Sequence, residues 1–344
     1  MSMRRHISFL AAIFICFINT AFAQQPYFSY ETKTRGESLS FPVFSRSGNT
    51  PATNKINRFL QLSELRILQG YEKKDIFEMI AGEDSNYNIS CDIKQNAAQL
   101  LSVRFNLATC GATCYYWTNC YNFNAQTGDP VQLGDLLTAD GLEAFSAKAT
   151  ARWSTQMDAA LKKQDANIIE EMQQFKECFN DSPYTLLESF YVQGNDLYID
   201  AENCLPKFAK FYDIDTAVRF SIKELTPYLN DYGRSIFKLS SKPLTAFKSE
   251  LLKELIVFTS KDKSVVLAVV KGHQDYNEFF YADLKNSIRE VFEGNYNTSV
   301  LKLADYDGKD KTAQLTATIK ANEATVVYEY ANGKKIPAVV LTRQ

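Results

Sequence analysis

The order of apolar and polar residues divides the chain into an α+β part and an all-β part. In the first part, Tyr27 to Phe44 alternates like one or two strands, and Asn54 to Gln69 carries apolar residues at helical spacing. Three alternating runs follow and predict an antiparallel meander: Tyr87 to Lys94, Gln99 to Leu107 and Tyr115 to Asn124. This order of elements predicts an antiparallel sheet packed with helices.

Two helices and a second group of strands follow the meander. Helical spacing covers two stretches, Leu142 to Lys162 and Ala166 to Cys178. Two short strands joined at Gly194-Asn195 predict a β-hairpin over Ser189 to Asp200. Ala217 to Ile222 predicts one more strand, and Lys223 to Leu229 a short helix after it.

Beyond the polar stretch Ser240 to Pro243, short strands separated by turns replace the mixed pattern. Seven segments alternate or are β-branched: Glu254 to Thr259, Val265 to Lys271, Glu278 to Leu284, Val300 to Ala304, Gln314 to Lys320, Thr325 to Tyr330 and Ala338 to Leu341. We therefore expect an α+β domain at residues 24–239 and a small antiparallel β domain at residues 240–344. The second domain is a meander or a barrel-like sheet.

The first 23 residues have the three parts of a secretory signal peptide. A basic start at Arg4 and Arg5 precedes an apolar run from Ile7 to Ile18, and Ala21 to Ala23 supplies small side chains before a cut at Gln24. An uncleaved N-terminal anchor is the alternative, but it needs a longer apolar run, near 20 residues. We expect an exported protein, periplasmic or secreted, without a membrane anchor.

The composition without the leader is that of an ordinary globular protein. The leader holds two of the 38 basic residues and no acidic ones, so 36 basic residues face 40 acidic ones, a net charge of −4. No basic cluster occurs, which argues against a nucleic-acid partner. The aromatic content is high, with 19 Tyr and 24 Phe, and it suits a half-buried sheet or a binding surface.

Six cysteines remain after Cys16 leaves with the leader, and an even number in an oxidising compartment favours disulfides. Cys110 and Cys114 flank a Gly-Ala-Thr turn that can bring them together. By subtraction, the remaining cysteines form two pairs, Cys178 with Cys204 and Cys91 with Cys120. Zinc is the competing use of cysteines, but no second C-x2-C pair and no nearby histidine is present, so we expect no metal site.

Residue types that carry catalysis are sparse. His273 is the one histidine after the leader, and no nucleophile elbow, P-loop or Rossmann fingerprint accompanies it. Paired carboxylates leave a carbohydrate-active hydrolase as the alternative. The acidic residues considered are Glu170, Glu171, Asp181, Glu188, Asp196 and Asp200. Because the adjacent Glu170 and Glu171 diverge by ~100° on a helix, they do not face one site. We expect no catalytic residue and no cofactor.

An aromatic patch follows the Cys110–Cys114 turn. Tyr115, Trp117, Tyr121 and Phe123 share one face of the predicted strand. If that face is buried, these rings are core packing. If the hairpin tip is exposed, Tyr115, Tyr116 and Trp117 form a rigid aromatic binding edge. Trp117→Ala separates the two interpretations, because only the core interpretation predicts a collapsed fold.

Three groups of short segments form an ordered set over Tyr27 to Phe237. They are Phe41 to Phe44 with Asn54 to Asn57; Leu101 to Phe105 with Gly111-Ala112, Tyr121 to Asn124, Thr127-Gly128 and Leu133 to Leu137; and Ser189 to Tyr191 and Tyr198-Ile199 with Val218 to Ile222 and Leu225 to Leu229. This set resembles the extracytoplasmic module of RsiV-type lysozyme-sensing anti-sigma factors and PdaC-type peptidoglycan deacetylases.

The resemblance implies a non-enzymatic binding module of the cell envelope, with a lysozyme-like protein or a peptidoglycan-type glycan as its partner. The sequence departs from that module in two loops. Cys110 and Cys114 bracket the Gly-Ala turn, and Asn203 to Phe208 replaces a Tyr-containing passage. Both loops are possible contact regions, so the ligand does not carry over. The deacetylase domain, with its metal-binding residues, has no counterpart after Ser240.

Overall fold

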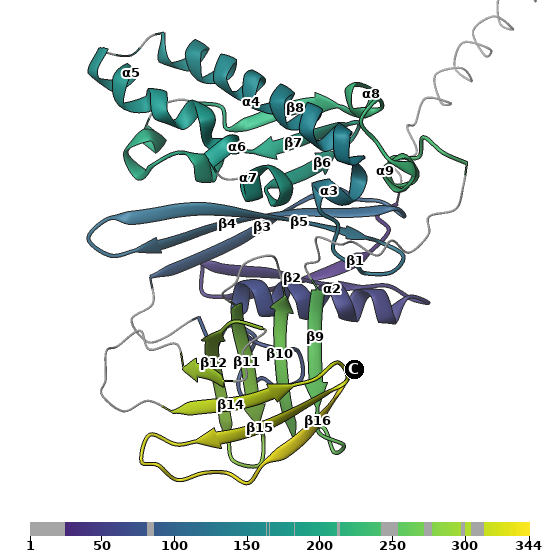
Figure 1. Cartoon of the computed structure of the whole chain (residues 1–344), viewed down its shortest axis with the longest axis vertical. Coiled ribbons are helices and arrows are strands. Elements are labelled where there is room, and N and C mark those ends of the chain that lie inside the picture. Colours follow the sequence, from purple (N-terminus) through teal and green to yellow (C-terminus); the bar gives the residue numbers. More distant parts are fainter. Residues whose placement is uncertain are drawn as a thin grey trace, which may run out of the picture.

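The computed structural model describes residues 25–80, 86–162, 164, 166–181, 183–211, 214–241, 254–271, 277–296, 300–303 and 313–344. The predicted leader, His273 and the part of the predicted boundary after Ser241 lie outside these ranges. Across the described ranges the fold is α+β, as predicted, with helices on largely antiparallel sheets and an all-β barrel at the C-terminal end. Figure 1 shows these parts as successive layers.

A five-stranded sheet with the order β1-β2-β3-β4-β5 lies in the middle of the molecule. Its strands are β1 (Ser29–Arg35), β2 (Leu39–Ser45), β3 (Tyr87–Asn96), β4 (Leu100–Cys110) and β5 (Cys114–Asn124). Helix α2 (Thr50–Leu65) crosses one face of this sheet. There the Phe59 ring meets Tyr121 and Phe123 edge-on, with centroids 5.8 and 5.5 Å apart. The even-numbered side chains of β5 point to the opposite face.

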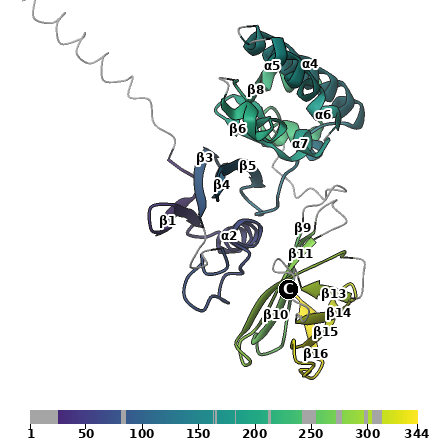
Figure 2. The same cartoon turned by 90° about the vertical axis from the view of Figure 1, so that its left-hand side faces the viewer.

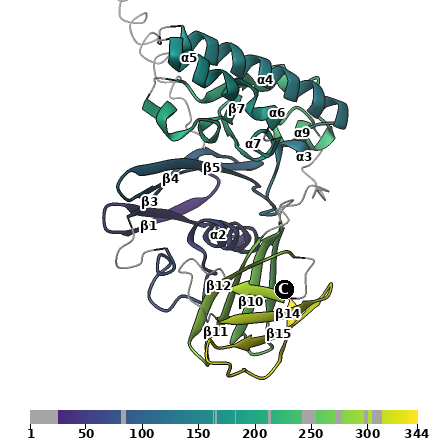
Figure 3. The same cartoon turned by 60° about the vertical axis from the view of Figure 1, so that its left-hand side comes forward.

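A three-stranded sheet, with helices on its outer side, covers that opposite face (Figure 3). Its strands are β6 (Phe190–Gln193), β7 (Asp196–Asp200) and β8 (Ala217–Ser221). The helices and 3-10 turns are α3 (Leu133–Leu136), α4 (Ala139–Leu161), α5 (Ala166–Gln173), η1 (Gln174–Glu177), α6 (Cys178–Asp181), α7 (Pro183–Glu188), η2 (Glu202–Cys204), η3 (Lys207–Phe211), α8 (Ile222–Leu225) and α9 (Asp231–Ile236). Helix α4 buries Phe145, Trp153 and Met157 at helical spacing. The second predicted helix is broken into α5, η1 and α6.

The C-terminal part is a closed barrel of eight strands that follow one another around the ring. They are β9 (Glu254–Thr259), β10 (Val265–Lys271), β11 (Asn277–Asp283), β12 (Ile288–Gly294), β13 (Val300–Leu303), β14 (Gln314–Ile319), β15 (Glu323–Glu329) and β16 (Val339–Arg343). Seven were predicted, and β12 was missed because Arg289, Glu290 and Glu293 interrupt its apolar pattern. Glu290 lies opposite Tyr281 and accepts a hydrogen bond from the Tyr328 hydroxyl at 2.8 Å.

Three barrel strands, β9, β10 and β11, are apolar on both faces where they pack against the core around α2. On β10, Leu267 belongs to the interior of the barrel, whereas Val266 and Ala268 join the core around α2. On β11, Tyr281 points inward and Phe280 outward in the same way. This explains why the sequence of these strands is an almost continuous apolar run. Figure 2 shows α2 between the five-stranded sheet and the barrel.

Two of the three predicted disulfides are present, and the third pairing is wrong. The disulfides are Cys110–Cys114 and Cys178–Cys204. Cys91 and Cys120 are both free thiols. Cys91 lies opposite Phe105 on β4, whereas Cys120 lies opposite the adjacent Arg104. Since neighbouring positions on a strand point to opposite faces, the two thiols lie on opposite sides of the sheet and cannot pair.

Candidate functional site

A groove of about 400 Å³ lies where the β4–β5 hairpin meets the loop after β7. We call it the tip groove. Its lining residues are Arg104, Asn106 and Leu107 on β4, Cys114, Tyr116, Trp117 and Thr118 on β5, and Glu202 and Lys207 in the loop. It therefore joins an aromatic hairpin to a cluster of polar side chains.

Disulfides hold both walls of the tip groove. Cys110–Cys114 closes the hairpin turn, and Cys178–Cys204 ties the opposite loop to α6. The Lys207 ammonium donates a hydrogen bond to the Thr113 hydroxyl and so joins the two walls directly. A binding surface held in this way loses little conformational entropy when a ligand binds.

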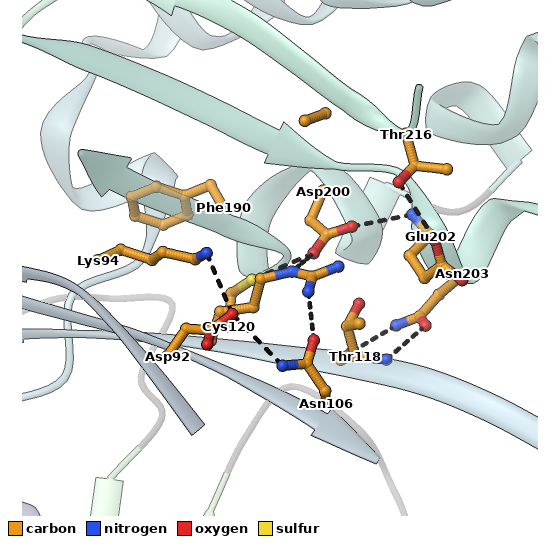
Figure 4. Close-up of polar contacts among 12 residues, drawn as sticks. Asp92, Lys94, Asn106, Thr118, Cys120, Phe190, Asp200, Glu202, Asn203 and Thr216 are labelled. Carbon is orange, nitrogen blue, oxygen red and sulfur yellow. Dashed lines mark hydrogen bonds and ion pairs between the residues drawn. The ribbon is translucent and has the colours of Figure 1, made fainter. Parts of the chain in front are cut away.

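The opposite loop is also fastened to the edge of β5, the last strand of its sheet. The Asn203 side-chain amide takes the place of a neighbouring strand at Thr118. Its Nδ2 donates to the Thr118 carbonyl at 2.7 Å, and its Oδ1 accepts from the Thr118 N–H at 3.1 Å (Figure 4). These two bonds satisfy backbone groups that an edge strand otherwise leaves open.

An ion pair between Arg104 and Asp200 forms the inner end of the cluster. Arg104 Nε donates to Asp200 Oδ2, and its Nη1 donates to Asn106 Oδ1. Asp200 is only 2% exposed, and its Oδ1 accepts from the Glu202 N–H at 3.0 Å. Burial lowers the pKa of Arg104, but the charge of Asp200 and its hydrogen bond more than offset this, so the pKa is raised. The guanidinium stays charged.

The thiol of Cys120 lies 3.8 Å from the same Asp200 oxygen. Burial, followed by the negative charge of Asp200, raises the pKa of this thiol well above its usual range. The protonated thiol donates to the carboxylate and is no nucleophile, because reactivity needs the thiolate. Asp200 is therefore held by Arg104, Cys120 and the backbone of Glu202.

The three predicted edge residues divide between the two faces of β5. Tyr116 lies on the face of Thr118 and lines the tip groove. Tyr115 and Trp117 stack on the other face with centroids 5.5 Å apart, and Trp117 meets Tyr87 edge-on at 5.8 Å. Tyr115 and Tyr116 are each 52% exposed. Core packing thus describes the buried end of β5, at Phe123, whereas the rings near the hairpin tip, Tyr115 and Tyr116, are exposed.

None of the acidic residues considered for a hydrolase lines the tip groove. Asp200 is engaged as described, and Asp196 forms an ion pair with Arg219 at 2.8 Å. Glu170 and Glu171 lie on α5, outside the tip groove. Within the described ranges, no cluster of His, Cys, Asp or Glu has the arrangement of a metal site. None of the helices in those ranges combines the length and apolarity needed to cross a membrane.

Sequence reasoning did not single out most of the polar groove residues, which are Arg104, Asn106, Thr118, Glu202 and Lys207. One signal pointed toward them. Two loops that the sequence analysis had singled out, Cys110 to Cys114 and Asn203 to Phe208, contribute residues to this one groove.

Two solved structures of DUF3298 family proteins are similar to this chain. No protein-family model and no curated protein matches the sequence. A crystal structure of a DUF3298 family member from Bacteroides fragilis is similar, with 16% identity and a TM-score of 0.44, over 63% of this chain and 99% of the other. A DUF3298 protein from Pseudomonas aeruginosa PAO1 is similar at 14% identity and a TM-score of 0.37, over 60% of this chain and 94% of the other.

Proposed function

We propose that this chain is an exported, non-enzymatic binding protein of the bacterial cell envelope, and that its tip groove holds a peptidoglycan-type glycan. The observation that carries the proposal is the combination, in one groove, of the exposed Tyr116 ring with the fixed polar side chains of Arg104 and Asn106. A sugar ring has apolar faces that pack on an aromatic ring, and its hydroxyl and acetamido groups bond to planar polar side chains.

The polar side of the groove supports the same ligand. The Thr118 hydroxyl oxygen is buried without a hydrogen-bond partner, and a ligand hydroxyl can satisfy it. Lys207 is a cationic group of the lining and Glu202 its one carboxylate, whereas the charge of Arg104 is already paired with that of the buried Asp200. A glycan that carries peptide stems presents carboxylates, which can pair with the Lys207 ammonium.

Export is supported by the leader pattern and by the two disulfides, which persist in oxidising compartments. In such a compartment an exported protein has access to the glycan of the cell wall. The absence of a free carboxylate pair in the tip groove favours binding over hydrolysis, since a glycosidase needs two carboxyl groups across the scissile bond.

A lysozyme-like protein is the second candidate partner. Tyr115 and Tyr116 project from a disulfide-closed hairpin, and exposed tyrosines on a rigid support are common anchors of protein interfaces. A carbohydrate-active hydrolase, the third alternative, differs from both because it releases new reducing ends.

Calorimetric titration of the chain from Gln24 with soluble peptidoglycan fragments, and separately with lysozyme, tests the proposal. We expect saturable binding of the fragments, at least fivefold weaker in Tyr116→Ala with an unchanged melting temperature. Tyr30→Ala is the matched control, because Tyr30 is 50% exposed on β1, away from the groove. Binding of lysozyme alone supports the second candidate, and new reducing ends support a hydrolase. No binding to either ligand refutes a binding role of this kind.

A further inference from the structure

A larger groove, of about 1040 Å³, lies at the other end of β4 from the hairpin tip. We call it the amide groove. The turns β3–β4 and β6–β7, the β8–α8 segment and the end of α9 meet there. Four side-chain amides line it, those of Gln95, Gln99, Gln193 and Asn195. No residue of the amide groove belongs to the tip groove.

The amide lining is held together from within. Gln95 Oε1 accepts a hydrogen bond from the Gly194 N–H at 3.1 Å, so one amide links two of the turns. Gln99 is different, because its Oε1 is buried and has no hydrogen-bond partner. A buried acceptor without a partner lowers stability and calls for an explanation. Since the last torsion of a glutamine is soft, a small turn of the amide presents this oxygen to a donor in the groove.

The rim of the amide groove is cationic. Arg219, Lys223 and Lys238 line it, against the single carboxylate of Asp196, which pairs with Arg219 at 2.8 Å. Lys238 has a φ of 58° just after α9. This left-handed position at a helix end favours glycine, so a lysine here is held at a cost to stability.

We infer that the amide groove is a second binding site, for a saccharide that carries carboxylate groups. The amides bond to hydroxyl and acetamido groups, the Gln99 oxygen gains a donor, and the lysines face the carboxylates. Ligand binding would explain why the fold keeps the unpartnered Gln99 oxygen and the left-handed Lys238, both of which lower the stability of the free protein. Along β4, Leu100 of the amide groove and Arg104 of the tip groove are four residues apart, roughly 13 Å, so one glycan strand can contact both. Only the identity of the glycan rests on the proposed function.

The test uses two substitutions that favour the free fold. Gln99→Met keeps the shape and removes the unpartnered oxygen, and Lys238→Gly relieves the left-handed lysine. Each variant of the chain from Gln24 is titrated with peptidoglycan fragments of four sugars bearing peptide stems, and with the neutral N-acetylglucosamine tetramer. We expect Gln99→Met to weaken both ligands at least fivefold, and Lys238→Gly to weaken only the charged fragments, about threefold. Both variants keep or raise the melting temperature.

Matched controls exist elsewhere in the chain. Gln61 on α2 also has a buried, unpartnered Oε1, and Lys263 in the β9–β10 turn also has a φ of 58°; neither lines the amide groove. Gln61→Met and Lys263→Gly should leave affinity unchanged. Equal affinity in Gln99→Met and Gln61→Met overturns the inference. If only Tyr116→Ala weakens binding, the tip groove stands alone; if only Gln99→Met and Lys238→Gly do so, the amide groove stands and the tip groove falls.

Discussion

The guanidinium of Arg104 and the carboxylate of Asp200 form an ion pair across the interface between the five-stranded and three-stranded sheets. Arg104 lies in the middle of β4, and Asp200 is the last residue of β7. The loop that forms one wall of the tip groove starts directly after Asp200. The pair therefore sets where this loop begins, and Asn203 sets where it meets β5.

Replacing Arg104 with methionine should cost about 3–5 kcal/mol of unfolding free energy, because it leaves the buried Asp200 charge without its partner. Adding Asp200→Asn should recover part of this loss. Urea unfolding of the two single variants and the double variant measures the coupling. Lys33→Met is the control, since the exposed Lys33–Glu31 pair contributes at most about 1 kcal/mol. Equal losses at the two sites would contradict the assigned role of Arg104.

Alanine substitutions along β5 should show a gradient of stability from its core end to its tip. Phe123→Ala should cost roughly 3–5 kcal/mol, because Phe123 is fully buried. Trp117→Ala should cost about 1–2 kcal/mol through its lost contacts with Tyr115 and Tyr87. Tyr116→Ala should stay within about 0.5 kcal/mol. Chemical denaturation at one pH measures all three, and a collapse in Tyr116→Ala would make the tip part of the core.

The two disulfides should differ in what they stabilise. Cys110 and Cys114 are four residues apart, so the chain-entropy estimate for removing this bridge is about 2 kcal/mol. Cys178 and Cys204 are 26 residues apart, and the corresponding figure is about 3.5 kcal/mol. Paired serine variants, compared by thermal unfolding, check the order. Cys110–Cys114 closes the hairpin turn at the tip groove. We therefore expect its removal to weaken the binding of peptidoglycan fragments clearly, although it lowers stability less than removal of Cys178–Cys204.

The stability of the fold should depend on pH through the carboxyl group of Glu224. Hydrogen bonds from Arg152 and then from the Ser221 N–H lower the pKa of this carboxyl from 4.5 to about 2. A lowered pKa in the folded state stabilises the fold above pH 4.5, and this contribution disappears as the pH falls through about 2. Glu224→Gln should therefore melt lower than the parent near neutral pH and melt with it near pH 2. Glu37→Gln, an exposed change in the β1–β2 turn, is the control for removing one acidic side chain.

Sequence patterns predicted the fold well where one face of an element is buried. Strands such as β14 and β15 alternate visibly because each has an inner and an outer side. Strand β12 was not predicted because its inward Glu290 interrupts the apolar pattern. Glu290 is accommodated by a hydrogen bond from Tyr328, a residue far away in the chain. The wrong cysteine pairing had a similar cause, since subtraction ignores which face of a sheet each thiol occupies.

The candidate site was predicted only at its aromatic edge. Tyr115, Tyr116 and Trp117 stood out because they cluster beside a cysteine turn. Arg104 and Glu202 are ordinary charged residues in sequence, and only the folded chain brings them together. Such convergence depends on long-range packing, for which a single sequence carries no local signal.

The core around α2 contains residues of both predicted domains, so we expect the two to unfold together. Phe59 on α2 packs against the sheet, while Val266 and Phe280 of the barrel close the same core, and Arg66 pairs with Glu278. Each part loses its share of the core around α2 when the other melts. Two fragments divided near residue 240 should therefore be less stable than the intact chain and prone to aggregate. The intact chain should melt in a single cooperative step. The two parts can be told apart in the sequence, but we expect them to unfold in one transition.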